Sequence, residues 1–171
     1  MARLFLPFCM LALLVGPLAA QEMSPASIAD SFSEAWEQRN EDLLETLFAP
    51  EATYQTPDAV YQGVEGVVQF LRNAFVVAPE SRLEFLDEIV GDSDVALEWV
   101  WSGTHTGNLP NLPATGRDFV VHGVTVLEIE DGLITRATDY YDRFGFLQQL
   151  GVMPPAGESG SPSGASGPGS Q

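Results

Sequence analysis

Two aspartates, Asp139 and Asp142, flank a pair of tyrosines in the stretch TDYYD, where an expected strand meets the last expected helix. A carboxylate in apolar surroundings has a raised pKa and can transfer protons, whereas one that precedes a helix can accept its first backbone N–H bonds. Alternation along the strand places the two aspartates on opposite faces if no bulge intervenes, which argues against a paired dyad. We predict that Asp142 caps the helix and that Asp139 is the acid–base group, with a solvated surface position as the alternative for Asp139.

The same alternation defines the neighbours of Asp139. Its face of the strand is expected to carry Leu133, Thr135, Ala137 and Tyr141. No basic side chain stands beside the carboxylate on this face, so a cavity there would surround it with apolar and aromatic groups. Tyr141 therefore becomes a candidate ligand contact.

Tyr54 and Thr56 alternate onto one face of the expected strand over residues 51–57. A tyrosine hydroxyl can donate a hydrogen bond to a carbonyl or enolate oxygen and so stabilise negative charge that develops during a reaction. Ordinary aromatic packing is the alternative for Tyr54. We keep Tyr54 as a catalytic candidate and Thr56 as a ligand-binding candidate.

Three tryptophans complete the expected ligand contacts. Trp99 and Trp101 share one face of the strand over residues 94–105, where two indoles would form an apolar wall for a ligand. Packing in the core is the alternative for both. Trp36 lies on the apolar face of the first expected helix and is the third candidate.

Two histidines, His105 and His122, fall on neighbouring expected strands. Their titration range suits acid–base chemistry or a metal site. A metal site is not expected, because the histidines lack the spacing of known ligand motifs and no cysteine lies beyond the N-terminal segment. We take His105 as a substrate-orienting candidate and His122 as a ligand-binding one, with a structural role as the alternative. No phosphate loop or dinucleotide motif is present, lysine is absent, and no cofactor is predicted.

The elements that must position these residues follow from hydrophobic periodicity. Ser24 and Pro25 are typical of a helix start, and apolar residues then recur at helical spacing. A short helix after Asn40 and a longer one after Gly63 flank the strand over 51–57. The pattern then changes to alternation, which predicts four strands and a closing helix over 81–90, 94–105, 117–130, 132–142 and 143–151. This order predicts an α+β domain in which N-terminal helices pack on a curved, mainly antiparallel sheet, forming a cone with an open mouth.

Composition adds limits on localisation and partners. The 171 residues carry 24 acidic and 7 basic side chains, a net charge of −17 that argues against nucleic acid or an anionic membrane surface as partner. Residues 1–20 have the layout of a secretory signal peptide, with a retained anchor as the alternative, so we expect a periplasmic or secreted protein. Residues 24–153 form the expected domain, and the Gly-, Ser- and Pro-rich residues 154–171 an expected disordered tail.

Several motifs resemble one known group of proteins. They are G-x-H-x-G at 103–107, PATGR at 113–117, EDGLI at 130–134 and the QLG that ends the last expected helix. Together with the order of elements, they resemble the nuclear transport factor 2-like superfamily and, within it, the SnoaL-like polyketide cyclases. The resemblance implies the cone-shaped fold, and it is weaker for the reaction, because this fold carries isomerases, cyclases, epoxide hydrolases and non-catalytic domains.

Two better-defined relatives can be compared residue by residue. The general base of ketosteroid isomerase corresponds to Thr56, so that base is missing, and Asp58 beyond the proline is a poor substitute. The arginine–aspartate pair of limonene epoxide hydrolase corresponds to Trp99 and Trp101, whereas its last-strand aspartate matches Asp139. The pocket aspartate of the SnoaL-like cyclases corresponds to either Asp139 or Asp142.

The sequence thus predicts an exported, cofactor-independent domain that binds a small, largely apolar carbonyl or epoxide compound. If it is an enzyme, Asp139 would carry isomerisation, cyclisation or hydration. The alternative is a non-catalytic ligand-binding or dimeric assembly module of the same fold. A homodimer is expected through the sheet face turned away from the helices, where Val120, Val124 and Val126 would otherwise meet water.

Overall fold

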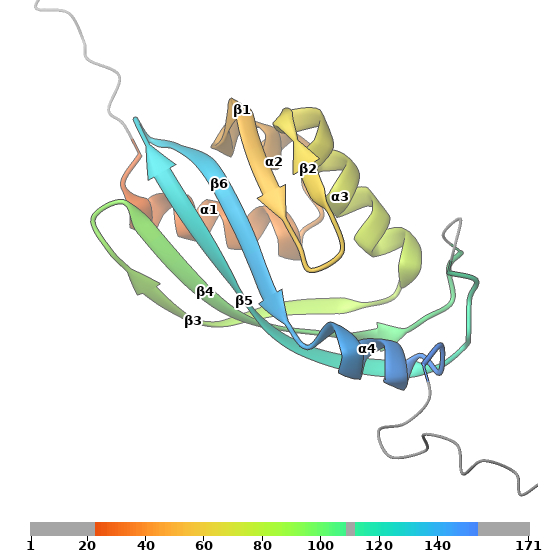
Figure 1. Cartoon of the computed structure of the whole chain (residues 1–171). Helices are drawn as coiled ribbons and strands as arrows, with labels where there is room; N and C mark the ends of the chain where they lie inside the picture. Colours follow the sequence, from red (N-terminus) through yellow and green to blue (C-terminus); the bar gives the residue numbers. More distant parts are fainter. Residues whose placement is uncertain (1–22, 109–111, 154–171) are drawn as a thin grey trace, which may run out of the picture.

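One curved sheet of six strands carries three helices on one face and a fourth at its end (Figure 1). The computed structural model describes residues 23–108 and 112–153. Its helices are α1 (Pro25–Glu37), α2 (Glu41–Leu47), α3 (Gly63–Val77) and α4 (Arg143–Gln149). Its strands are β1 (Phe48–Gln55), β2 (Val60–Gln62), β3 (Arg82–Val90), β4 (Asp94–Thr104), β5 (Asp118–Glu130) and β6 (Leu133–Tyr141). The expected signal peptide and tail lie outside the described residues.

The strand order is β2-β1-β6-β5-β4-β3, and every neighbouring pair is antiparallel except β1 and β6. The predicted α+β class, with helices packed on a curved and mainly antiparallel sheet, is therefore confirmed. The sequence did not predict β2, because its three residues are too few to show alternation. Within the described ranges, no helix is long and apolar enough to cross a bilayer.

Local chemistry explains where the elements begin. The Ser24 hydroxyl accepts the Ser27 N–H at the start of α1, and the Asn40 side chain accepts the Leu43 N–H at the start of α2. Between β5 and β6, Asp131 and Gly132 both have positive φ, as a two-residue hairpin turn requires. Each of these short signals is readable in the sequence, and each is formed in the structure.

A register shift in β6 changes which residues face the helices. The partner of Glu128 is Arg136, whereas the partner of Ile129 is Ile134, so the segment around Thr135 contains one extra residue. Ile134 is consequently buried, and the expected inward face that included Leu133 and Thr135 is wrong there. The alternation is regular from Ala137 onward, which leaves the predicted orientation of Asp139 intact.

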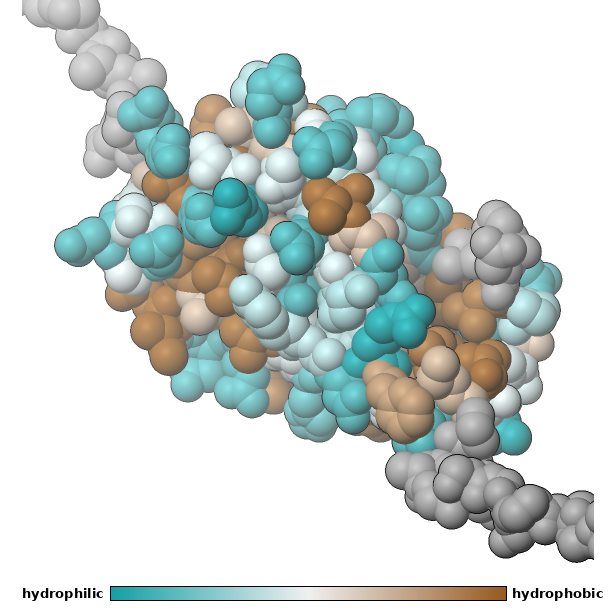
Figure 2. All heavy atoms as spheres, viewed as in Figure 1, coloured by the Kyte–Doolittle hydropathy of each residue, from teal (hydrophilic) through white to brown (hydrophobic). Residues whose placement is uncertain are grey.

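The face of the sheet turned away from the helices is partly apolar. Val120 on this face is 51% exposed, and Val124 and Val126 are half-buried. Hydrophobic side chains gather over β3, β4 and β5 in the view of Figure 2. Ile89, the most exposed large apolar residue of the described ranges, pairs with Ala96 on this face.

Candidate active site

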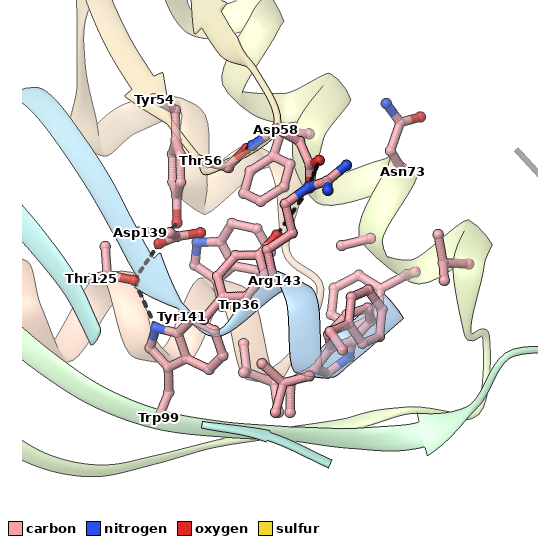
Figure 3. A pocket seen from close by; sticks show the side chains of 18 of the residues that line it. Trp36, Tyr54, Thr56, Asp58, Asn73, Trp99, Thr125, Asp139, Tyr141 and Arg143 are labelled. Atoms are coloured by element: carbon pink, nitrogen blue, oxygen red, sulfur yellow. Dashed lines mark hydrogen bonds and ion pairs between the residues drawn. The ribbon is translucent and has the colours of Figure 1, made fainter. Parts of the chain in front are cut away.

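A cavity of about 550 Å³ opens between the inward face of the sheet and helices α1 and α3. This volume is within the range of small-molecule sites. Its wall is mainly aromatic: Phe32, Trp36, Phe70, Phe75, Phe85, Trp99, Trp101 and Phe146. Interacting polar side chains form two groups, a buried floor around Asp139 and a partly exposed mouth around Asp58 and Arg143, and Asn73 of α3 adds a further polar side chain to the lining (Figure 3).

The floor is a hydrogen-bonded group that four strands, β1, β4, β5 and β6, bring together. Tyr54 of β1 donates its hydroxyl to Asp139 Oδ1 at 2.9 Å, and Thr125 of β5 donates to the same oxygen at 2.6 Å. Trp99 of β4 donates its Nε1–H to Thr125 Oγ1 at 2.9 Å. An indole N–H can only donate, so Thr125 accepts from it and directs its own hydrogen to the carboxylate. The floor thus has one defined hydrogen-bond direction, ending on Asp139.

Gly123 makes room for this arrangement. It pairs directly with Trp99 across β4 and β5, and a Cβ atom on Gly123 would overlap the six-membered ring of the indole. The absence of a side chain lets the Trp99 ring lie against β5, where its nitrogen reaches Thr125. The glycine therefore positions the second hydrogen-bond donor of Asp139 indirectly.

Burial controls the ionisation of the floor. Asp139 is only 8% exposed, and desolvation raises its pKa to about 7, although the bonds from Thr125 and Tyr54 favour the charged form. Burial, followed by the neighbouring Asp139 charge, raises the pKa of Tyr54 well above its usual value. At neutral pH, Tyr54 is a proton-bearing donor while Asp139 exchanges between acid and carboxylate.

The two oxygens of Asp139 have different surroundings. Oδ1 accepts both hydroxyl hydrogen bonds, whereas Oδ2 has no hydrogen-bond partner among the described residues. The Nε1–H of Trp36 also lacks an acceptor within the described ranges, and its ring packs against Tyr54 with centroids 6.0 Å apart. Both side chains line the cavity. One oxygen is therefore used to hold the carboxyl group, and the other remains for chemistry.

The mouth joins the β1–β2 connection to the start of α4. Asp58 accepts the Tyr141 hydroxyl on Oδ2 at 3.2 Å and the Nε–H of Arg143 on Oδ1. Thr56 shapes this connection, because its hydroxyl accepts the backbone N–H groups of Asp58 and Ala59 at 3.2 and 3.1 Å. Burial, with a further contribution from the Asp58 charge, raises the pKa of Tyr141 above its usual range. A neutral tyrosine and an ion pair therefore stand at the entrance.

The structure brings together most of the side chains chosen from the sequence. Asp139 and Tyr54 lie in direct contact on the floor. The predicted ligand contacts that line the cavity are Trp36, Thr56, Trp99, Trp101 and Tyr141. The expected difference between the two aspartates is also present, because Asp142 Oδ1 accepts the Gly145 N–H at 2.9 Å as the N-cap of α4.

Both histidines lie elsewhere, which corrects their assignment to the site. His105 has no exposed surface, and its Nδ1 lies 3.1 Å from Thr115 Oγ1 in the connection after β4. Its backbone N–H and C=O bond to Arg117 and Gly116. His122 pairs with Val100 and is exposed on the sheet face away from the helices, because the side chains of β5 alternate. No group of side chains in the described ranges is arranged to hold a metal ion.

Sequence reasoning missed three residues of the site. Thr125 was detectable as the one hydroxyl on an inward face otherwise made of Phe119, Val121, Gly123, Leu127 and Ile129. Asp58 was considered only as a poor substitute for a general base, and its pairing with Arg143 was missed because 85 positions separate the two residues and only the folded chain joins them.

The profile of the SnoaL-like polyketide cyclase family matches residues 26–150. The chain belongs to this family. The suspected membership of the nuclear transport factor 2-like superfamily is thereby confirmed. Of the two aspartates considered from the sequence, Asp139 lines the cavity and Asp142 caps α4.

Individual relatives support the same family and fold. The chain is 34% identical over 95 residues to the aklanonic acid methyl ester cyclase DnrD of Streptomyces peucetius, covering 56% of this chain and 64%, just under two thirds, of that protein. It is 31% identical over 125 residues to the aklanonic acid methyl ester cyclase DauD of Streptomyces sp. strain C5, covering 71% and 75%. The structure of IdmH from Streptomyces antibioticus, described as a putative polyketide cyclase, superposes with a TM-score of 0.64 at 24% identity, covering 75% and 99%, which supports the fold.

Proposed function

We propose that this SnoaL-like protein is an acid–base enzyme that closes a ring in a largely apolar carbonyl compound. The observation that carries the proposal is a buried carboxyl group with one unpartnered oxygen at the floor of a 550 Å³ aromatic cavity. A pKa of about 7 lets Asp139 serve as base and acid in turn at neutral pH, which is the optimum for such catalysis.

The reaction we propose is an intramolecular aldol-type cyclisation. Ionised Asp139 removes a proton from the carbon next to a carbonyl, and the resulting enolate carbon attacks a second carbonyl of the same molecule. One carbon–carbon bond forms, and protonated Asp139 returns the proton to the new alkoxide oxygen. The proton balance closes on Asp139, so no oxidant or reductant is consumed.

The floor offers one donor for the charge that develops on the substrate. The Trp36 Nε1–H has no acceptor among the described residues, and a substrate oxygen would satisfy it. Preorganised donors of this kind stabilise enolate and alkoxide oxygens more strongly than water does. Tyr54 and Thr125, whose hydrogens are committed to Asp139, hold the carboxyl group in place.

Two observations support a polyketide-derived substrate. The relatives DnrD and DauD are named for cyclising aklanonic acid methyl ester. The cavity wall of this chain is aromatic, which suits stacking of a flat ring system. An open cavity of this size also argues against a module whose cone is filled by its own side chains.

Proton transfer can be tested before the natural substrate is known. We expect the wild-type protein to speed deuterium incorporation from D₂O into the α-carbon of 2-tetralone, followed by NMR, and to cyclise aklanonic acid methyl ester or a close analogue. Asp139→Asn should lower either rate by roughly a hundredfold or more. Asp142→Ala is the matched control and should leave both rates unchanged. Equal rates for wild type and Asp139→Asn would refute the proposal and favour a non-catalytic binding module.

Export and dimerisation belong to the same proposal. The apolar residues 4–18, followed by small residues at 19 and 20, support cleavage near residue 20 and a periplasmic or secreted product. Mass spectrometry should find a mature N-terminus near residue 21, and intact Met1 would contradict export.

The exposed Val120 and its neighbours on the outer sheet face support a homodimer. Light scattering at micromolar concentration should give twice the chain mass, which Val120→Glu should halve.

A further inference from the structure

The mouth of the cavity contains a guanidinium group whose outer nitrogens are unused. Arg143 donates its Nε–H to Asp58, and the other oxygen of Asp58 accepts the Tyr141 hydroxyl. The orientation of the guanidinium is thereby fixed from one edge. Nη1 and Nη2 have no hydrogen-bond partner among the described residues.

The position of this group makes it available to a ligand. Arg143 lines the cavity, its side chain is 43% exposed, and it is the only cation in the described lining. The terminal nitrogens of a guanidinium present parallel N–H groups that match two acceptor oxygens of one substituent. Since the residue already balances the charge of Asp58, its free edge offers directional hydrogen bonds more than net charge.

Asp139 and Arg143 lie close together in the chain and belong to the two polar places of one cavity. They are four residues apart, so their Cα atoms are separated by at most about 14 Å. In Figure 3 Asp139 and the Asp58–Arg143 pair form separate groups of the lining, and the rings of Trp36 and Tyr141 are drawn between them. A flat ligand that reaches from one polar place to the other can stack on that wall.

We propose that Arg143 binds an oxygen-bearing substituent of the substrate at the mouth while the reacting carbonyl lies at Asp139. The substrate class is then a flat, largely apolar compound with a ketone at one end and an ester, a carboxylate or adjacent oxygens at the other. This assignment rests on the proposed function for the reacting end and concerns the opposite end of the same ligand. Arg143 acts as a positioning and specificity-determining residue.

Two sources of acceptor oxygen fit the guanidinium. A carboxylate gains charge-assisted hydrogen bonds, but the chain carries a net charge of −17, which opposes the entry of anions. An ester keeps an acceptor without that repulsion. The two therefore differ in charge and share the acceptor chemistry that the proposal requires.

Binding can be measured with three matched probes by equilibrium dialysis. They are methyl 2-naphthoate, 2-naphthoate and 2-ethylnaphthalene, which share a ring system and differ in the oxygens of the substituent. The wild-type protein should bind at least one oxygenated probe about tenfold more tightly than the hydrocarbon, a ratio that corresponds to about 1.4 kcal/mol. The preferred probe then identifies the natural substituent as ester or carboxylate.

Variants of the guanidinium give the decisive comparison. Arg143→Gln should abolish the preference and leave 2-ethylnaphthalene binding unchanged, whereas Arg143→Lys should keep part of any preference for the carboxylate and lose that for the ester. Arg136→Gln is the matched control, because Arg136 lies on the outer face of β6 in an ion pair with Glu128. Circular dichroism would verify that each variant is folded.

Three results would overturn the assignment. They are equal wild-type affinity for the three probes, a preference that survives in Arg143→Gln, and no binding of any probe. Asp139→Asn separates this proposal from the proposed function, since it should abolish proton transfer while preserving the preference of the mouth. Loss of the preference in Arg143→Gln would therefore stand even if the Asp139 mechanism failed.

Discussion

Asp139 and Asp142 carry the same side chain three residues apart and serve different regions of the molecule. Asp139 is buried on the cavity floor and accepts two side-chain hydroxyls on one oxygen. Asp142 is exposed at the corner between β6 and α4 and accepts a backbone N–H at 2.9 Å. The difference shows that the chemistry of a carboxylate is set by its solvation and its hydrogen-bond partners. Here both change within three residues.

The largest change in stability is expected from removing the charge of Asp139 on the cavity floor. Asp139→Asn keeps the shape of the side chain and removes the buried charge. Because a pKa shift of one unit corresponds to about 1.4 kcal/mol, a shift to about 7 makes the variant more stable above pH 7 by up to about 4 kcal/mol. Urea unfolding at pH 8 would measure the gain, and a loss of stability would break the contrast between the two aspartates.

The pH dependence of the wild-type protein sharpens the same comparison. The pKa of Asp139 is higher in the folded state than in the unfolded one, so the folded chain holds the proton between about pH 4 and pH 7. Its contribution to stability is complete below about pH 4 and is lost as pH rises through 7. The stability difference between wild type and Asp139→Asn should therefore grow from pH 5 to pH 8. Carboxyl NMR should give a midpoint near 7 for Asp139, and an unshifted value would contradict the desolvated floor.

An intermediate effect on stability and activity is expected at Gly123, which makes room for the Trp99 ring beside the floor. Gly123→Ala places a methyl group against the Trp99 ring, which must move away from Thr125. Overpacking of this kind costs about 1–3 kcal/mol. Catalysis should also fall, because the Thr125 hydrogen is then free to turn from Asp139. The indole N–H resonance of Trp99 would report the displacement, and a displaced resonance with full activity would show that the indole does not orient the floor.

The smallest change in stability is expected at the corner between β6 and α4. Asp142→Ala removes the N-cap of α4 and should lower the free energy of unfolding by roughly 1 kcal/mol. Proton transfer at Asp139 should be unaffected, since the side chains point to different surroundings. Thermal unfolding combined with the 2-tetralone assay would separate the two quantities. A large loss of activity with unchanged stability would reverse the roles of the aspartates.

Local patterns predicted much of this molecule. The fold class, the caps at Ser24 and Asn40, the Asp131–Gly132 turn and the orientation of Asp139 all follow from spacing and turn chemistry. These signals are short-range, so one sequence suffices to read them.

Other features required the folded chain. Burial of His105 in the connection after β4, and its distance from the cavity, depend on contacts with residues 115–117. The register shift near Thr135 is a tertiary adjustment that alternation alone does not reveal. The meeting of Asp58 with Arg143 depends on strand pairing across most of the chain.

The parallel pairing of β1 with β6 has a consequence for folding. It places Tyr54 in register with Ala137, two residues from Asp139, although β2, α3, β3, β4 and β5 all lie between these strands in the chain. Closing so long a loop is entropically costly, and contacts of this kind slow folding. The hairpins β3–β4 and β5–β6 can form early from local contacts, whereas the floor is complete only after the two ends of the domain have met. The reactive carboxyl group therefore acquires its tyrosine partner only in a late step of folding.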